Sequence, residues 1–370
     1  MAVQEGLDGV VAFASALSAT EGSTLSYRGY SIEDLAAHAT FEEVLYLLWY
    51  GRLPQQRALD SFTQELHSQY ALPAEMLALM QRLPRAGHPM DYVRTITSLL
   101  AHYDPDQGDN SRAANRRKAT RLVARLPGAV ATFGRLRQGQ EPPTPHPELS
   151  LAAHFLYMLH GAMPEAEHAQ AFDTTLIVQA DHELSASTFA ARVTVATLSD
   201  MYSGVVSAIG TLKGPLHGGA NEQVMRMLQA MGSDENVEPY LMAALARKQR
   251  IMGFGHRVYK DGDPRARVLQ PLARSLGEAS GQPHWYTMAV RMQELMAQEK
   301  GLVPNVDFYA APVYYALGLP IDMFTPAFVL SRVAGWTAHI MEQLGRNRMI
   351  RPRAQYIGPS QLPWQPLTDR

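Results

Sequence analysis

The sequence predicts a mainly α-helical fold, and three observations lead to this prediction. Apolar residues recur at helical spacing along most of the 370-residue chain. The alternation of apolar and polar residues that is typical of strands is confined to the first thirty residues and, more weakly, to the tail. Glycine and proline separate the helical stretches, where they end one helix before the next begins.

The first predicted helix follows Thr40. Thr40 and Glu43 form a capping-box pattern, and Gly51 with Pro54 supplies the stop. The same periodicity predicts further helices over residues 57–69, 73–82, 92–100, 115–138 with a kink or break at Pro127, 147–159, 166–178, 188–212, 221–231, 239–249, 264–276, 286–300, 313–317 and 324–344.

Two stretches of the sequence are expected to pack closely against other parts of the protein or against another subunit. Residues 188–212 carry alanine, serine and glycine on several faces, so neighbouring helices can approach closely, either in the core or at a subunit contact. Residues 351–370 contain four prolines and cannot form a regular helix. We expect this C-terminal segment to be an extended arm that lies on another surface.

Length and composition narrow the class of protein. A chain of 370 residues is long for one core and predicts a large domain with a smaller inserted one. A charged fraction of 18% is compatible with a large subunit interface, so we expect a homo-oligomer. The net charge of -2 gives no reason to expect nucleic acid, and no apolar run approaches the roughly 18 residues that cross a membrane. The lack of cysteine excludes disulfides and thiol catalysis, and the N-terminus shows no targeting pattern, so we expect a cytoplasmic protein.

Two histidines and one aspartate stand at turns rich in glycine or proline, namely His217, His256 and Asp307. Such a set suits removal of a proton from a carbon next to a carbonyl group. His217 precedes the helix predicted from Asn221, whose positive end disfavours a protonated imidazole. We interpret His217 as a neutral hydrogen-bond donor, with a purely structural turn histidine as the alternative.

His256 lies in a basic run, which predicts either an anion-binding surface suited to phosphate groups or a solvated face. The cations of this run are Arg247, Lys248, Arg250, Arg257 and Lys260. Beyond it, Asp263 and Pro264 are good first residues of a helix, which places Arg265 in the first turn. There the guanidinium and the free N–H groups could hold a carboxylate together.

Asp307 and Arg332 both stand in apolar surroundings. Burial would raise the pKa of Asp307 and make it a competent base, although a helix cap is the alternative. Arg332 must meet an anion in its apolar helix, so we expect it to bind a carboxylate. His339, on the same helix, is expected to be a hydrogen-bonded core residue. His182 lies between two acids, but no metal-ligand spacing appears in the chain, so no metal site is predicted.

Six sequence motifs resemble those of the citrate synthase family and occur along the chain in the order found in that family. They include Gly-Pro-Leu-His-Gly-Gly-Ala-Asn at 214–221, Gly-Phe-Gly-His-Arg-Val-Tyr at 253–259 and Ser-Arg-Val-Ala-Gly-Trp at 331–336, besides residues 180–184, 263–265 and 304–307. Residues 6–11 and 27–35 also look like the N-terminus of the family, so the resemblance covers nearly the whole chain. Six ordered motifs are far more specific than any one of them.

The resemblance implies a helical homodimer that transfers an acyl group from acetyl-CoA to oxaloacetate. A small domain, residues 220–318, would close over the substrates on a large domain, residues 1–219 and 319–370. Asp307 would remove a proton from the acetyl methyl group while neutral His217 hydrogen-bonds the thioester oxygen. His256 would protonate the ketone oxygen of oxaloacetate, and hydrolysis of citryl-CoA would release citrate and CoA.

The resemblance also implies the binding residues. Oxaloacetate would be held by His182, His256, Arg265 and Arg332, with the partner subunit's Arg351 reaching in from its C-terminal arm. Contacts with CoA would come from Arg250, Arg257, Lys260 and Asn305. Acetyl-CoA would be a co-substrate, and neither a permanently bound cofactor nor a metal is implied.

Two departures from the family pattern flank His182. Gln179 stands where many members have histidine, and Ser185 stands where they have asparagine. Glutamine can donate a hydrogen bond but cannot become charged, which indicates either altered substrate contacts or harmless variation. The alternative within the family is 2-methylcitrate synthase, which uses propionyl-CoA, because an extra methylene changes binding by only about 1 to 3 kcal/mol. The alternatives outside it are a metal-dependent lyase and a non-catalytic helical scaffold.

Overall fold

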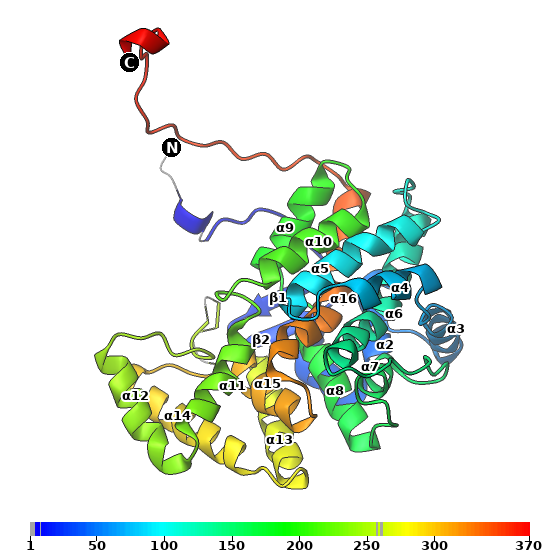
Figure 1. Ribbon diagram of the computed structural model, residues 1–370, viewed down its shortest axis with the longest axis vertical. Coiled ribbons are helices and arrows are strands. Elements are labelled where there is room, and N and C mark those ends of the chain that lie inside the picture. Colours follow the sequence, from blue (N-terminus) through cyan, green and yellow to red (C-terminus); the bar gives the residue numbers. More distant parts are fainter. Residues whose placement is uncertain (1–3, 8, 257, 260–261) are drawn as a thin grey trace.

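The computed structural model describes residues 4–7, 9–256, 258–259 and 262–370. Within these ranges it contains sixteen α-helices and one small sheet, which confirms the predicted mainly α fold (Figure 1). The helices are α1 Ile32–His38, α2 Phe41–Tyr50, α3 Gln56–His67, α4 Ala74–Arg82, α5 Pro89–Leu100, α6 Arg112–Arg137, α7 Leu151–His160, α8 Ala166–Gln179, α9 Ala186–Ala196, α10 Met201–Leu212, α11 Ala220–Met231, α12 Val237–Ala246, α13 Pro264–Ala279, α14 His284–Lys300, α15 Val306–Ala316 and α16 Phe324–Gly345.

The sheet lies in the first part of the chain, as predicted. Strands β1 Ser18–Glu21, β2 Thr24–Tyr27 and β3 Tyr30–Ser31 are antiparallel in the order β1-β2-β3. The described tail contains no strand, so the weaker signal there was wrong. The side chains of Leu25 and Tyr27 are buried, which attaches the sheet to the helical core.

Local capping explains where many helices begin. The Thr40 backbone N–H donates to Glu43 at 2.7 Å while the Thr40 side chain accepts from the Glu43 backbone, which confirms the capping box of α2. Gly51 ends that helix with φ 78°. Asp263 caps α13, and Pro264 is its first residue, as predicted.

Two predictions of helix boundaries were wrong, and so was a break at Pro127, one of the two alternatives predicted there. The stretch 188–212 is two helices, α9 and α10, because Leu198 takes a left-handed conformation with φ 68° and Asp200 caps the second helix. Helix α15 runs through Pro312 and begins at Val306, where the Asn305 side chain caps it. Helix α6 continues without interruption through Pro127.

Helix α16 is the centre of the fold. It is buried along most of its length and packs against α2, α6, α8, α9 and α10. Gly204 of α10 allows this close approach, because a Cβ atom there would lie 2.8 Å from Val195 and 2.9 Å from Ile340. Ala191, Gly204 and Ala208 are buried, so these small residues of α9 and α10 serve packing within the core, one of the two predicted outcomes.

Helices α11 to α15 lie together at one end of the molecule (Figure 1). Within this group α13 and α11 pack on α15, and α12 packs on α14. Residues 346–370 leave the body as an extended, exposed segment whose large apolar side chains include Ile357, 91% exposed, and Trp364, 79% exposed. In the described part of the chain no helix is long and apolar enough to span a membrane.

Candidate active site

His217 lies in the turn before α11 and is held by α9 and α16. Its Nε2 atom is 2.8 Å from the hydroxyl of Ser187 and accepts a hydrogen bond from the Ser187 backbone N–H at 3.3 Å. The indole N–H of Trp336 donates to the same hydroxyl at 3.2 Å. Since Nε2 accepts, the proton of a neutral imidazole is on Nδ1.

The charge state of His217 agrees with the sequence-based interpretation, but the main physical cause differs. Burial lowers the pKa of His217 to about 4, and the positive charges of Arg332 and Arg265 act in the same direction. The helix predicted from Asn221 does follow His217 and begins one residue earlier, at Ala220. His217 is therefore neutral near pH 7, mainly because it is buried among cations.

His182 and His256 lie side by side at the C-terminal end of α8. Their ring centroids are 5.1 Å apart, and Nε2 of His182 is 3.0 Å from the hydroxyl of Tyr259. Nδ1 of His256 accepts from the backbone N–H groups of Val258 at 3.0 Å and Tyr259 at 3.3 Å. A neutral His256 therefore carries its proton on Nε2, the nitrogen that faces Arg265 at 3.5 Å.

Arg265 is buried and bound by its own helix cap. Its Nε and one terminal nitrogen donate to Asp263 at 2.9 and 2.8 Å. Although burial opposes the charge, Asp263 raises the pKa of Arg265 above its usual value. Asp263 also accepts from the Arg265 backbone N–H at 3.0 Å and from the Val306 N–H at 2.9 Å. This carboxylate thus joins the first turns of α13 and α15, and it occupies the position expected for a ligand carboxylate at the α13 amides.

Arg332 lies on α16 and is 1% exposed. Its Nε donates to the Gln179 carbonyl at 2.7 Å, and a terminal nitrogen lies 3.5 Å from the Ser185 hydroxyl. Burial and the nearby charge of Arg265 lower the pKa of Arg332 to about 10. Arg265 and Arg332 thus place two positive charges in one buried site, and an anion there would reduce the repulsion between them.

Asp307 is in the first turn of α15, and the cap of that helix is Asn305 instead. The Oδ1 atom of Asp307 is buried and has no hydrogen-bond partner among the described residues. Burial raises the pKa of Asp307 to about 7, against the opposing effects of Arg265 and Arg332. A carboxyl group with this pKa is suited to accept a proton near neutral pH.

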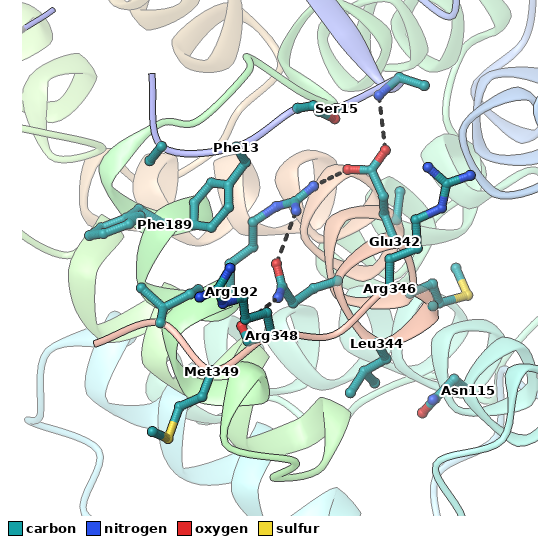
Figure 2. Close-up of a pocket in the computed structure, with 18 of the residues that line it drawn as sticks. Phe13, Ser15, Asn115, Phe189, Arg192, Glu342, Leu344, Arg346, Arg348 and Met349 are labelled. Atoms are coloured by element: carbon teal, nitrogen blue, oxygen red, sulfur yellow. Dashed lines mark hydrogen bonds and ion pairs between the residues drawn. The ribbon is translucent and has the colours of Figure 1, made fainter. Parts of the chain in front are cut away.

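Of the remaining candidates, Asn305 adjoins this cluster, Arg351 and Arg250 line cavities, and two lie outside the described residues. Arg351 is exposed and lines a cavity of about 1220 Å3 between the N-terminal segment and the end of α16 (Figure 2). Arg250 is exposed beside a smaller cavity of about 190 Å3. The Asn305 amide is occupied by the Gly255 carbonyl and the Asp307 N–H. Arg257 and Lys260 lie outside the described residues.

Sequence reasoning missed three groups that hold the site together: Ser187, Tyr259 and the indole of Trp336. Tyr259 and Trp336 end motifs that were recognised, but nothing local indicated that their polar atoms would contact His182 and Ser187. The side chain of Gln179 accepts from the hydroxyl of Tyr314 at 2.6 Å, so this departure is built into a buried contact. The other departure, Ser185, is the cap of α9.

The fold and the site are together those of a helical acid–base enzyme with an anion-binding centre. The sequence matches the family model described as citrate synthase, C-terminal domain, over residues 6–353. It is 49% identical to citrate synthase 2 of Bacillus subtilis, with 100% of both chains covered. It is 45% identical to a 2-methylcitrate synthase of Mycobacterium tuberculosis, covering 97% of this chain and 91% of the relative.

Solved structures agree. The fold is similar to that of a citrate synthase of Thermoplasma acidophilum in ternary complex with carboxymethyl coenzyme A and oxaloacetate, at TM-score 0.95 and 33% identity with 100% of both chains covered. A citrate synthase of Thermotoga maritima gives TM-score 0.90 and 37% identity, covering 100% of this chain and 99% of that one. The chain belongs to the citrate synthase family, whose members are acyltransferases that use no permanently bound cofactor.

Proposed function

We propose that this protein is a citrate synthase that condenses acetyl-CoA with oxaloacetate and hydrolyses the product to citrate and CoA. The observation that carries the proposal is the Asp307 carboxyl group, whose pKa burial raises to about 7, in a site where the charges of Arg265 and Arg332 act both on Asp307 and on the neutral His217. The Oδ1 atom of Asp307 also argues against a silent scaffold, because a buried carboxyl oxygen without a hydrogen-bond partner among the described residues is costly to retain.

In the first step Asp307 takes a proton from the methyl carbon of acetyl-CoA. The electron pair of that C–H bond moves toward the thioester, and the oxygen gains negative charge. The Nδ1–H of His217 donates a hydrogen bond to this oxygen, which stabilises the enolate at the moment when charge develops. A neutral imidazole suits this role, since it donates without surrendering its proton.

In the second step the enolate carbon attacks the ketone carbon of oxaloacetate, and a carbon–carbon bond forms. The ketone oxygen takes a proton from Nε2 of His256. Arg265 and Arg332 hold the two carboxylates, together with His182 and the partner subunit's Arg351. Water then cleaves the thioester of citryl-CoA, and CoA leaves as a thiol.

For CoA we propose the basic surface at the end of α12. Arg250 and Arg226 line the small cavity there, and Arg257 and Lys260 follow in the sequence. The two arginines at this cavity, Arg226 and Arg250, suit the phosphates of CoA. The amide of Asn305 would shape this region by holding the loop at Gly255.

We also propose that residues 220–318 form a small domain that closes over the substrates, and that the enzyme is a homodimer. The exposed C-terminal arm supports a dimer, because Tyr356, Ile357 and Trp364 expose more apolar surface than an isolated segment favours. The partner subunit's Arg351 would then complete each oxaloacetate site.

The test is release of free CoA by the purified protein, read with a thiol reagent. The chain has no cysteine, so the reagent reports CoA alone. We expect release from acetyl-CoA only when oxaloacetate is present, and we expect EDTA to have no effect. Release that needs a divalent ion would favour the metal-dependent lyase, and no release with either acetyl-CoA or propionyl-CoA would refute the proposal.

The second candidate is a 2-methylcitrate synthase, because relatives of that name are 45% identical to this chain. The ratio of kcat/KM for acetyl-CoA and propionyl-CoA, each with saturating oxaloacetate, separates the two activities. A ratio above one supports citrate synthase, and a ratio below one supports the second candidate. One methylene in an apolar pocket typically changes such a ratio of kcat/KM values by about 10- to 200-fold.

A further inference from the structure

A chain of buried polar side chains links α9 and α16 to the loop that carries His182. Nε2 of His339 lies 3.1 Å from a carboxylate oxygen of Asp181. On the other side of the ring, Arg192 donates to Nδ1 of His339 from two nitrogens, at 3.0 and 2.9 Å. The three side chains are at most 2% exposed, and none has a role in the proposed reaction.

The hydrogen bonds determine the tautomer of His339. A guanidinium can only donate, so Nδ1 of His339 must present its lone pair to Arg192. The ring proton is therefore on Nε2 and is donated to Asp181. Burial by itself would raise the pKa of Asp181, but His339 and the Ser18 hydroxyl hold it below its usual value. Asp181 is thus a carboxylate fixed in direction by His339.

Asp181 directly precedes His182, and Glu183, which directly follows His182, is also held by hydrogen bonds. The Ser18 hydroxyl of β1 donates to Asp181 at 2.6 Å and accepts from the Glu183 backbone N–H at 2.9 Å. Thr20 donates to the Glu183 carboxylate from its N–H at 2.8 Å and from its hydroxyl at 2.6 Å. Glu183 has φ 44°, a strained conformation for a residue other than glycine. The backbone of His182 is therefore clamped on both sides.

We propose that His339 is a positioning residue for oxaloacetate binding: its Nε2–H holds Asp181, and Asp181 with Ser18 holds the backbone of His182 in the orientation that the substrate needs. Arg192 supports this role by selecting the tautomer of His339. The inference rests on the proposed function, because it takes His182 as an oxaloacetate ligand. It assigns a task to a histidine that the sequence predicted only as a core residue.

Contacts on the side of Arg192 that faces away from His339 hold its guanidinium in place. Its guanidinium lies between the ring of Phe13, 5.2 Å away, and the carboxylate of Glu342, with which it is paired (Figure 2). A terminal nitrogen donates to Gln343 at 3.2 Å. Arg192 is thus fixed by groups that line the large cavity, and it is linked to Asp181 through His339.

The experiment compares His339→Leu with His339→Gln. Leucine removes both ring nitrogens, whereas the glutamine amide can donate to Asp181 and accept from Arg192. Thr337→Val is the matched control, because Thr337 is buried on the same helix and contacts Trp49 instead of the Asp181 chain. Calorimetry measures the Kd for oxaloacetate without turnover, and steady-state kinetics measure both KM values and kcat.

We expect His339→Leu to raise the Kd and KM for oxaloacetate by about tenfold or more, which is the effect of leaving a buried partner unpaired. The KM for acetyl-CoA should change by less than about threefold, and His339→Gln should bind oxaloacetate within about threefold of the unmodified protein. Unchanged oxaloacetate binding in His339→Leu would overturn the inference. A loss of oxaloacetate binding in His339→Gln or in Thr337→Val as large as that in His339→Leu would overturn it as well.

Ser18→Ala covers the case in which His339→Leu does not fold. Ser18 is on a partly exposed strand, and its hydroxyl bridges Asp181 and Glu183. We expect this variant to weaken oxaloacetate binding about threefold or more, and full binding would count against the clamp. Failure of the proposed function is distinguishable from failure of this inference. If the unmodified protein does not bind oxaloacetate, the proposed function is refuted; if only the variants behave otherwise than expected, the inference alone is refuted.

Discussion

The backbone N–H of Ser187 donates to Nε2 of His217, and this one contact decides which ring nitrogen of His217 carries the proton. The donor is main chain, so the tautomer does not depend on the rotamer of any side chain. The Ser187 hydroxyl, 2.8 Å from the same nitrogen and itself bound by Trp336, adds a second support. His217 is thereby prepared to donate from Nδ1.

Ser187→Ala tests how much the hydroxyl adds. The backbone donor remains in this variant, so the tautomer should be kept while the ring is held less firmly. We expect kcat with acetyl-CoA to fall by about two- to tenfold, which is the effect of one hydrogen bond, and the Kd for oxaloacetate to stay unchanged. If Ser187→Ala keeps the kcat of the unmodified protein, the main-chain hydrogen bond from Ser187 is sufficient to hold the His217 ring.

The pH dependence of the reaction should report Asp307. A base must be deprotonated to act, and the pKa of Asp307 is about 7. We therefore expect kcat/KM for acetyl-CoA to fall about tenfold per pH unit below pH 7 and to level off above it. Asp307→Asn should lower kcat by about 10²- to 10⁴-fold and abolish this limb. A limb centred near pH 4 would contradict the raised pKa.

Arg332→Lys should weaken oxaloacetate binding even though the charge is kept. Lysine cannot donate to the Gln179 carbonyl and to a carboxylate in the planar geometry of a guanidinium. We expect the Kd for oxaloacetate to rise by about 10- to 100-fold, in line with lost hydrogen bonds to a charged group. Arg274→Lys, at an exposed ion pair with Glu278, is the matched control and should bind normally.

His154 should make the protein sensitive to acid. Burial lowers its pKa to about 4, its ring stacks 4.0 Å from Tyr70, and neither ring nitrogen has a partner among the described residues. The unfolded chain takes up this proton near pH 6.5, so the free energy of unfolding should fall as the pH drops from about 6.5 to 4. At pH 5, His154 should lower the free energy of unfolding by about 2 kcal/mol relative to its value well above pH 6.5.

Urea unfolding at pH 7 and pH 5 measures this effect. We expect His154→Gln to lose less stability between the two pH values than the unmodified protein does. His102→Gln, at an exposed position, should leave the difference unchanged. Equal pH dependence in all three proteins would mean that His154 is not held neutral by burial.

Gly335→Ala should damage the loop before His182. The Gly335 N–H donates to the Ala180 carbonyl at 3.0 Å, and a Cβ atom at Gly335 would lie 2.5 Å from that oxygen and 2.4 Å from a carboxylate oxygen of Asp181. Main-chain atoms cannot move aside easily, so we expect a loss of roughly 1 to 3 kcal/mol in unfolding free energy. Thermal unfolding measures it, and a stable, fully active variant would contradict the close packing of α16 on this loop.

Much of the fold was predictable because its signals are local. The capping box at Thr40, the cap at Asp263 and the periodicity of α16 each lie within a few residues, and each prediction was confirmed. The predictions that were wrong concern a weak strand signal in the tail and the points where helices begin, end or continue. A leucine at φ 68° divides α9 from α10, and no local pattern requires Leu198 to adopt that conformation.

The sequence by itself determined the helical class, the family and the turns that carry His217, His256 and Asp307, because caps, glycine turns and motif order are written along the chain. Tertiary structure alone decided what surrounds them. Arg192 meets His339 across 147 residues, and Tyr259 meets His182 across 77. Burial among such distant partners sets tautomers and pKa values, since desolvation and hydrogen bonding depend on packing. The neutral state of His217 therefore followed from the fold, whereas its position before a helix followed from the sequence.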